Sequence, residues 1–181
     1  GSFKSQTMPL ADLMDQTLFL SKLFKFEWIY EERAEFENVF LRTLKYYEGA
    51  GWLSISAEEP QTVMLQDPAP AELEFFRRLV LTFVEAYAIV FSLVGKNVEQ
   101  VLNKKEITEG ALKQGKADYL RGEILFQESL SKPTYENALR LLEDWKVLER
   151  VSDESKKKES YRLSEAWSEE GKYPALLKRL K

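Results

Sequence analysis

Glu85 is the residue of this 181-residue chain whose position most invites a chemical role. It is the one acid in the apolar stretch from Leu79 to Val94, and an unpaired carboxylate in apolar surroundings is costly or becomes protonated. A carboxyl group with a raised pKa can serve as a general acid, whereas one that finds a partner only holds a fold together. No second carboxylate or base at a telling spacing accompanies it. We therefore predict that Glu85 is a structural acid held by a buried partner.

The chain contains no histidine and no cysteine. Histidine is the commonest general base and metal ligand, and cysteine is required for a disulfide, a thiolate zinc site or a thiol nucleophile. The sequence also lacks a phosphate-binding glycine loop, a G-x-S-x-G elbow and a cluster of metal ligands. It therefore predicts no catalytic residue, no cofactor and no metal site within this chain.

The composition is that of an ordinary soluble domain, with 31% charged and 44% hydrophobic residues. The net charge of −4 argues against a general nucleic-acid binder. Gly1 and Ser2 are typical of an expression scar, so we expect one compact unit cut from a longer protein.

The stretch around Glu85 predicts a long helix over residues 71–94. Apolar residues recur there at steps of three and four and widen until they cover nearly the whole helix, which is typical of a central helix packed by its neighbours. A spanning helix needs roughly 20 apolar residues, and this run is shorter and begins beside Arg77 and Arg78. We predict a soluble, buried core helix.

Helical periodicity also predicts helices within residues 10–24, 31–51, 107–123, 131–145 and 173–181. Two glycines weaken the prediction for 107–123. Alternating stretches predict hairpins at 52–66 and 146–165. The predicted fold class is mainly α with short β-hairpins (α+β), built around the buried helix 71–94. The predicted parts are 1–66, with N-terminal helices and a hairpin, and 67–181, with the central helix, a winged-helix-like unit and a basic C-terminal helix.

Two stretches of the chain look alike, "YEGAGWLSIS" and "LEDWKVLERV". Glu48 matches Glu143 and Leu53 matches Leu148, and each stretch leads from a helix into a hairpin. Helix, turn, strand, loop and strand form the tail of a winged-helix unit, although so short a similarity leaves duplication open. The helix before the second hairpin carries several acids, which argues against DNA as its partner. A run of lysines in the hairpin loop, 156–158, is read as a solvated loop.

The C-terminal segment predicts a short basic amphipathic helix. Its apolar face can dock on the domain itself, which we favour because the segment is short, or lie on an anionic bilayer. The candidate membrane or partner contacts are Tyr173, Leu176, Leu177, Lys178, Arg179 and Leu180.

Three blocks of the chain occur in an order that is familiar from one family. They are Phe24–Trp28 after a leucine-rich stretch, the trio Glu85, Ala86 and Tyr87, and a segment with Gly122, Glu128, Ser129, Leu130, Ser131 and Asn137–Leu139. Together they resemble the C-terminal region of glycerol-3-phosphate acyltransferases and their dihydroxyacetone-phosphate relatives, from about residue 18 to 151. The chain departs from the pattern at Ser129, where alanine is usual. It also departs at Ala88, because an aromatic residue often follows the tyrosine of the second block.

The resemblance implies a non-catalytic C-terminal accessory domain of a membrane-associated enzyme of phospholipid biosynthesis. In that family an upstream histidine, four residues before an aspartate, acts as the base, and this chain has no histidine to match it. The implied partners are the upstream acyltransferase domain and an anionic membrane surface, with the parent, an O-acyltransferase, peripheral on the cytoplasmic side and the fragment soluble. The alternative is a winged-helix-like regulatory or assembly module that binds protein or DNA.

Overall fold

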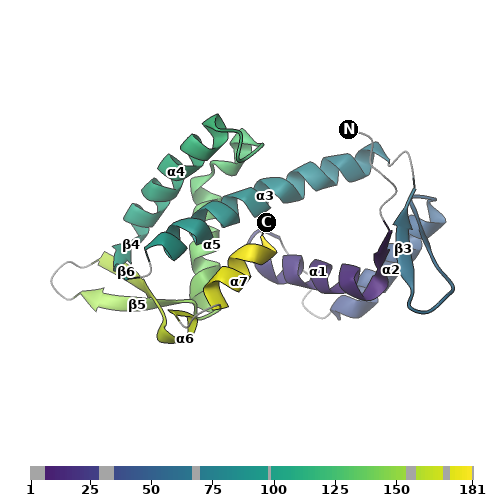
Figure 1. Ribbon diagram of the computed structural model, residues 1–181, viewed down its shortest axis with the longest axis horizontal. Coiled ribbons are helices and arrows are strands. Elements are labelled where there is room, and N and C mark those ends of the chain that lie inside the picture. The colour runs from purple at the N-terminus through teal and green to yellow at the C-terminus, as the bar shows by residue number, and fades with distance from the viewer. Residues whose placement is uncertain are drawn as a thin grey trace. The chain divides into compact units, whose positions relative to one another are not determined.

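The computed structural model describes residues 7–28, 35–66, 70–97, 99–153, 158–168 and 172–180. The chain divides into two compact units, unit 1 (residues 1–78) and unit 2 (residues 79–181), each of which is described by itself. The division falls inside the helix α3 (Ala71–Lys96), so this helix starts in one unit and ends in the other (Figure 1). The boundary predicted between residues 66 and 67 lies just before the same helix.

Unit 1 is a small helix pair with one antiparallel sheet. Its elements are β1 (Thr7–Pro9), α1 (Leu10–Leu23), α2 (Phe36–Gly49), β2 (Leu53–Ile55) and β3 (Thr62–Leu65). The strand order is β1-β3-β2, so the first strand pairs with the last. Apolar side chains from α2 and both hairpin strands form its core, namely Phe40, Leu44, Leu53 and Val63.

Unit 2 follows the same order of elements after the second half of α3. These are β4 (Leu102–Asn103), α4 (Lys104–Leu120), the short 3₁₀ helix η1 (Gln127–Ser129), α5 (Lys132–Asp144), β5 (Leu148–Asp153) and β6 (Lys158–Leu163). Two helices close the chain, α6 (Glu165–Ser168) and α7 (Lys172–Arg179). The strand order β4-β6-β5 again pairs the first strand with the last.

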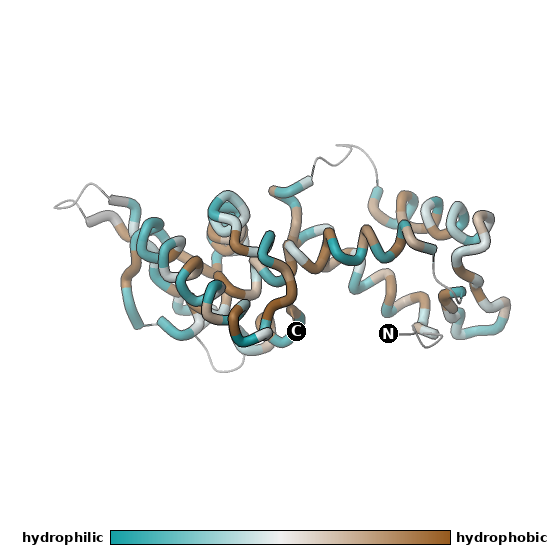
Figure 2. The backbone as a smooth tube through the Cα atoms, turned by 90° about the horizontal axis from the view of Figure 1, so that it is seen from above, coloured by the Kyte–Doolittle hydropathy of each residue, from teal (hydrophilic) through white to brown (hydrophobic). Residues whose placement is uncertain are grey.

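The predicted fold class is confirmed, because the chain is mainly helical with two small antiparallel three-stranded sheets. Hydrophobic and hydrophilic segments alternate along many of the helices, as amphipathic packing requires (Figure 2). The two short strands that complete the sheets, β1 and β4, were not predicted from the sequence. The lysines at 156 and 157 lie outside the described residues, as do the first four residues of the helix predicted over 31–51.

The turn that ends α2 shows how the first hairpin begins. The N–H of Gly51 donates to the carbonyl of Glu48 at 3.0 Å, and the N–H of Trp52 donates to that of Tyr47 at 2.9 Å. This pair of bonds is a Schellman cap, which needs a left-handed residue, and Gly51 has φ +74°. The rings of Trp52 and Tyr47 stack with centroids 5.0 Å apart and supply the apolar contact typical of this cap.

The turn that ends α5 repeats this geometry at the matching positions. The N–H of Lys146 donates to the carbonyl of Glu143 at 3.0 Å, and that of Val147 donates to the carbonyl of Leu142 at 2.8 Å. Here the left-handed residue is Lys146, with φ 58°, rather than a glycine. The similarity noticed between the two sequence stretches therefore extends to strand order and to individual hydrogen bonds.

Lys146→Gly is expected to raise the free energy of unfolding of unit 2 by about 1 kcal/mol. A side chain costs about that much in the left-handed region, and the exposed Lys146 side chain leaves little packing to lose. A urea titration measures the change. Gly51→Ala, at the equivalent position of unit 1, is the matched control and is expected to destabilise. Equal or lower stability of Lys146→Gly would contradict the cap geometry.

The glycines of α4 are packing positions, which corrects the weak helix expected there. A side-chain carbon at Gly115 would lie 2.7 Å from Leu130 and 3.0 Å from Ile89, and one at Gly110 would lie 3.1 Å from Leu93. A side chain at either position would require these neighbouring side chains to shift, so glycine favours the close approach of α4. A capping box between Asn103 and Glu106 also fixes the helix start, with 3.0 Å and 2.8 Å hydrogen bonds.

The long helix α3 has two different halves. Its predicted position, 71–94, agrees with the structure, and its second half is a true core helix with Tyr87, Val90 and Phe91 fully buried. Its first half differs from the prediction, since Phe75 and Phe76 are 64% and 49% exposed. By length and composition alone α3 could also cross a membrane, and 33% of its most apolar window is buried in the chain. The periodicity of apolar residues predicts the position of the helix, but it does not predict how much of the helix surface is buried.

Candidate functional site

The carboxylate of Glu85 joins α3 to the loop between α4 and α5. Its Oε1 accepts a hydrogen bond from the backbone N–H of Leu125 at 2.7 Å. Its Oε2 accepts two more, from the N–H of Phe126 at 3.2 Å and from the hydroxyl of Ser129 at 2.7 Å. We call these four residues the Glu85 clasp. Both carboxylate oxygens are thus occupied by the protein itself.

Local structure explains why the loop suits a carboxylate. Phe126 is the N-cap of η1, and the N–H groups at the start of a helix have no partner within the helix. An anion is favourable there because it meets these free donors and the positive end of the local dipoles. Ser129 is fully buried, so its hydroxyl depends on Glu85 for a strong acceptor. Glu85 itself is half-buried.

The loop that reaches Glu85 starts with a well-defined turn at the end of α4. Gly122 has φ +73°, and the N–H of Glu123 donates to the carbonyl of Asp118 at 2.9 Å, which closes another Schellman cap. Arg121 forms ion pairs with Asp118 and, at 2.8 Å, with Glu123. These ion pairs raise the pKa of Arg121 and lower that of Glu123, in each case mainly through the side-chain hydrogen bond between the two. The glycine of the third sequence block is thus required by the backbone.

Close to this loop, Tyr135 carries the described chain's one buried side-chain polar atom without a hydrogen-bond partner, its Oη. The side chain is fully buried, and its Oη would lie 3.0 Å from a side-chain carbon placed at Gly115. Burial, with a smaller contribution from the Asp118 carboxylate, raises the pKa of Tyr135 to about 12. The phenol therefore stays neutral and acts as a space-filling ring.

Tyr135→Phe is expected to keep or raise stability by about 1 kcal/mol at neutral pH, because it removes a buried hydroxyl that lacks a partner. The folded-state pKa lies above the ordinary 10.0, so the stabilisation due to the neutral phenol is complete below pH 10. It is lost as the pH rises from 10 toward about 12. Urea midpoints from pH 7 to 11 test both points. Tyr119→Phe, at an exposed tyrosine, is the control, and a large loss at neutral pH for Tyr135→Phe would contradict the account.

The C-terminal candidates are divided by α7 into a buried and an exposed set. Tyr173, Leu176 and Leu180 are buried, Leu177 is half-buried, and Lys178 and Arg179 are exposed. The hydroxyl of Tyr173 donates to the carbonyl of Phe91 at 2.7 Å, and its ring lies 2.8 Å from a side-chain carbon placed at Gly95. Burial raises the pKa of Tyr173. The apolar face of α7 is therefore docked on unit 2, and contact with a bilayer through it would require undocking.

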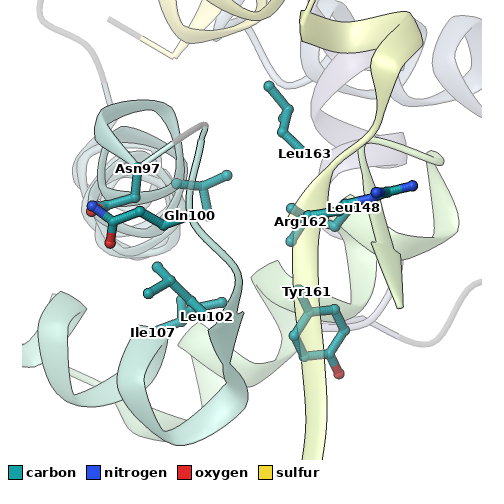
Figure 3. A pocket seen from close by; sticks show the side chains of 9 residues that line it. Asn97, Gln100, Leu102, Ile107, Leu148, Tyr161, Arg162 and Leu163 are labelled. Atoms are coloured by element: carbon teal, nitrogen blue, oxygen red, sulfur yellow. The ribbon is translucent and has the colours of Figure 1, made fainter. Parts of the chain in front are cut away.

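A small pocket lies in unit 2. It measures about 10 Å³, about enough for one water, and Figure 3 shows its lining from the end of α3, from β4 and α4, and from the hairpin. A second, open hollow of about 510 Å³ lies at the start of α4 and is lined by charged residues, among them Lys104 and Glu106. Lys104 is bound to Glu136 at 2.8 Å. Neither space is lined by histidine or cysteine, because the chain contains none.

No cluster of metal-binding side chains occurs among the residues that the structure describes. Sequence reasoning singled out Glu85 but not its partners, because two of the three donors are backbone N–H groups that carry no side-chain signal. Ser129 could have been singled out from the sequence, because it lies in the third block at a position where the family usually has alanine. The first block lies in unit 1, where Phe24 is fully buried and its ring meets that of Trp28 edge-on at 5.0 Å.

The second and third sequence blocks meet in space at the Glu85 clasp. Glu85 belongs to the second, and Gly122 and Ser129 belong to the third. A family model of the glycerol-3-phosphate acyltransferase C-terminal region matches residues 2–151, which confirms the resemblance seen from about residue 18 to 151. No curated protein was found to match the chain. The chain belongs to the family of glycerol-3-phosphate acyltransferase C-terminal regions.

Proposed function

We propose that this chain is the non-catalytic C-terminal accessory region of a glycerol-3-phosphate acyltransferase-like enzyme of phospholipid biosynthesis. In this proposal it packs on the upstream acyltransferase domain of the same protein and supports its structure. Acyl transfer to a hydroxyl needs a base within hydrogen-bond reach of that hydroxyl, together with donors aimed at the developing oxyanion. The sequence contains no histidine that could act as this base.

The observation that carries the proposal is the engagement of Glu85. It is the one acid in the apolar stretch of α3, yet both of its oxygens accept hydrogen bonds from the loop at 2.7–3.2 Å. A general acid or base must instead face the substrate. The residues that resemble the family's pattern at this place therefore serve the fold, and catalysis belongs elsewhere in the parent protein.

We also propose that the parent is peripheral on the cytoplasmic side of a membrane. Within α7, Lys178 and Arg179 are exposed and could add attraction to anionic lipid, at roughly 1 kcal/mol per residue. The docked apolar face makes α7 an auxiliary contact rather than an anchor. Sedimentation with anionic vesicles, with and without residues 172–181, tests this part of the proposal.

The second candidate function is a winged-helix-like assembly module, which the order of strands and helices in unit 2 favours. Its second helix, α5, exposes charges of both signs, including Lys132, Glu136 and Arg140. Glu136 is already paired with Lys104. Mixed charge suits a protein partner, whereas a duplex would need a basic face. This candidate would work through protein contacts, as the first one does.

The proposal is tested in the full-length parent by deleting this region. We expect acyl transfer from acyl-CoA or acyl carrier protein to labelled glycerol-3-phosphate to fall by about tenfold or more, which corresponds to ~1.4 kcal/mol. We also expect added 181-residue chain to restore part of it. A deletion that leaves both activity and heat stability unchanged would contradict the accessory role.

A further inference from the structure

Two leucines project from the loop that Glu85 holds. Leu120, at the end of α4, is 85% exposed, and Leu125, next to η1, is 66% exposed. They are the most exposed leucines among the described residues. Ile124, between them, is buried and anchors the loop from inside.

The loop presents these leucines rigidly. The N–H of Leu125 is bound to Glu85 at 2.7 Å, and the turn after Leu120 is fixed by the left-handed Gly122. Arg121 adds ion pairs to Asp118 and Glu123. A large exposed apolar side chain on a fixed backbone suits a binding surface, because a preorganised contact loses little entropy when a partner binds.

Charge favours a protein over a lipid surface as the occupant. Between residues 118 and 128 the chain carries three acids, Asp118, Glu123 and Glu128, and one base, Arg121, which is paired with two of them. Lys116, one turn earlier, is the nearest exposed cation before the loop. An anionic bilayer attracts clusters of basic residues, and this loop offers the opposite balance.

We propose that Leu120 and Leu125 dock into an apolar pocket, with a basic rim, on the upstream acyltransferase domain. This inference rests on the proposed accessory function and names the surface through which it acts. Glu85 and Gly122, which support the loop, belong to the sequence blocks by which the chain resembles its family. The family's name describes the C-terminal region of an acyltransferase, so the acyltransferase domain of the proposed function is the partner for which the loop is held.

Hydroxyl-radical footprinting of the full-length parent and of the 181-residue chain tests this inference. We expect oxidation of Leu120 and Leu125 to fall several-fold in the parent relative to the chain alone. Val101, 53% exposed and remote in sequence from the loop, is the internal control and is expected to react equally in both. Equal reactivity of the two leucines in parent and chain would overturn the inference.

The double variant Leu120→Ser/Leu125→Ser supplies the second readout, with Val101→Ser as its matched control. Both are expected to leave the urea midpoint of the isolated chain unchanged, because the side chains are exposed. In the parent, only the double variant is expected to open the junction to limited proteolysis. Protection of the leucines in the isolated chain by phosphatidylglycerol vesicles, or by raising its own concentration, would instead assign the surface to lipid or to a second copy and overturn the inference. If deletion of the region impairs the parent while the leucines stay reactive, the accessory function stands and only this docking surface fails.

Discussion

Glu85→Ala is expected to lower the free energy of unfolding of unit 2 by about 2–4 kcal/mol. The change removes three hydrogen bonds to a charged acceptor, each worth about 1.5–3 kcal/mol before water replaces part of it. The fully buried Ser129 hydroxyl has little access to water, so water compensates least for the loss of its hydrogen bond to Glu85. Hydrogen exchange provides a local measurement, since the amides of Leu125 and Phe126 should exchange much faster in the variant.

Three comparisons make this prediction specific. Glu85→Gln is expected to lower the free energy of unfolding by less than Glu85→Ala does, but still measurably, because the glutamine NH₂ would face one of the donors of the loop. Glu85→Leu is expected to cost as much as alanine, since no substitution removes the backbone N–H groups of the loop. Glu109→Ala, at an exposed acid whose ion pair with Lys105 spans 3.8 Å, is the control and is expected to change stability by about 0.5 kcal/mol or less. A Glu85→Ala variant as stable as Glu109→Ala would refute the structural role.

Tyr173→Ala is expected to cost about 3–5 kcal/mol, the range for emptying a buried aromatic site. The ring fills the space against Gly95, and the hydroxyl adds a 2.7 Å bond to the carbonyl of Phe91. Tyr173→Phe keeps the ring and is expected to cost only about 1 kcal/mol. Urea unfolding monitored by circular dichroism gives both values.

Lys178→Ala is the control for this prediction, because Lys178 lies on the exposed face of the same helix. It is expected to change the stability by no more than about 0.5 kcal/mol. If Tyr173→Ala were no more destabilising than Lys178→Ala, α7 would not be docked in solution. Its apolar face would then be available to an anionic bilayer, and binding to a membrane through this face would become the favoured interpretation.

Much of the secondary structure was predictable because apolar periodicity and end signals agreed. The prediction placed a helix over 10–24 where α1 covers Leu10–Leu23, and one over 131–145 where α5 covers Lys132–Asp144. The Ser131 hydroxyl caps the start of α5, because it accepts a hydrogen bond from the N–H of Thr134 at 3.4 Å. Where glycine was read as a helix breaker, as in α4, the prediction underestimated the helix. A single sequence does not show that a neighbouring side chain occupies the space beside Gly115.

The candidate site was predictable only in part. The apolar setting of Glu85 identified the residue, but its partners lie 40 or more positions away and are mainly backbone groups. The exposure of Leu120 and Leu125 could not be predicted either, since a leucine at a helix end reads as core until the fold shows which way it faces. Long-range packing decided both features.

We propose that this chain supports an acyltransferase without performing the transfer. The most direct measurement incubates the purified 181-residue chain with labelled glycerol-3-phosphate and either acyl-CoA or acyl carrier protein, and follows the acylated product. With no histidine in the chain and the Glu85 carboxylate held by the loop, we predict no turnover above the uncatalysed background. Turnover by this chain alone that Glu85→Gln abolishes would contradict the account.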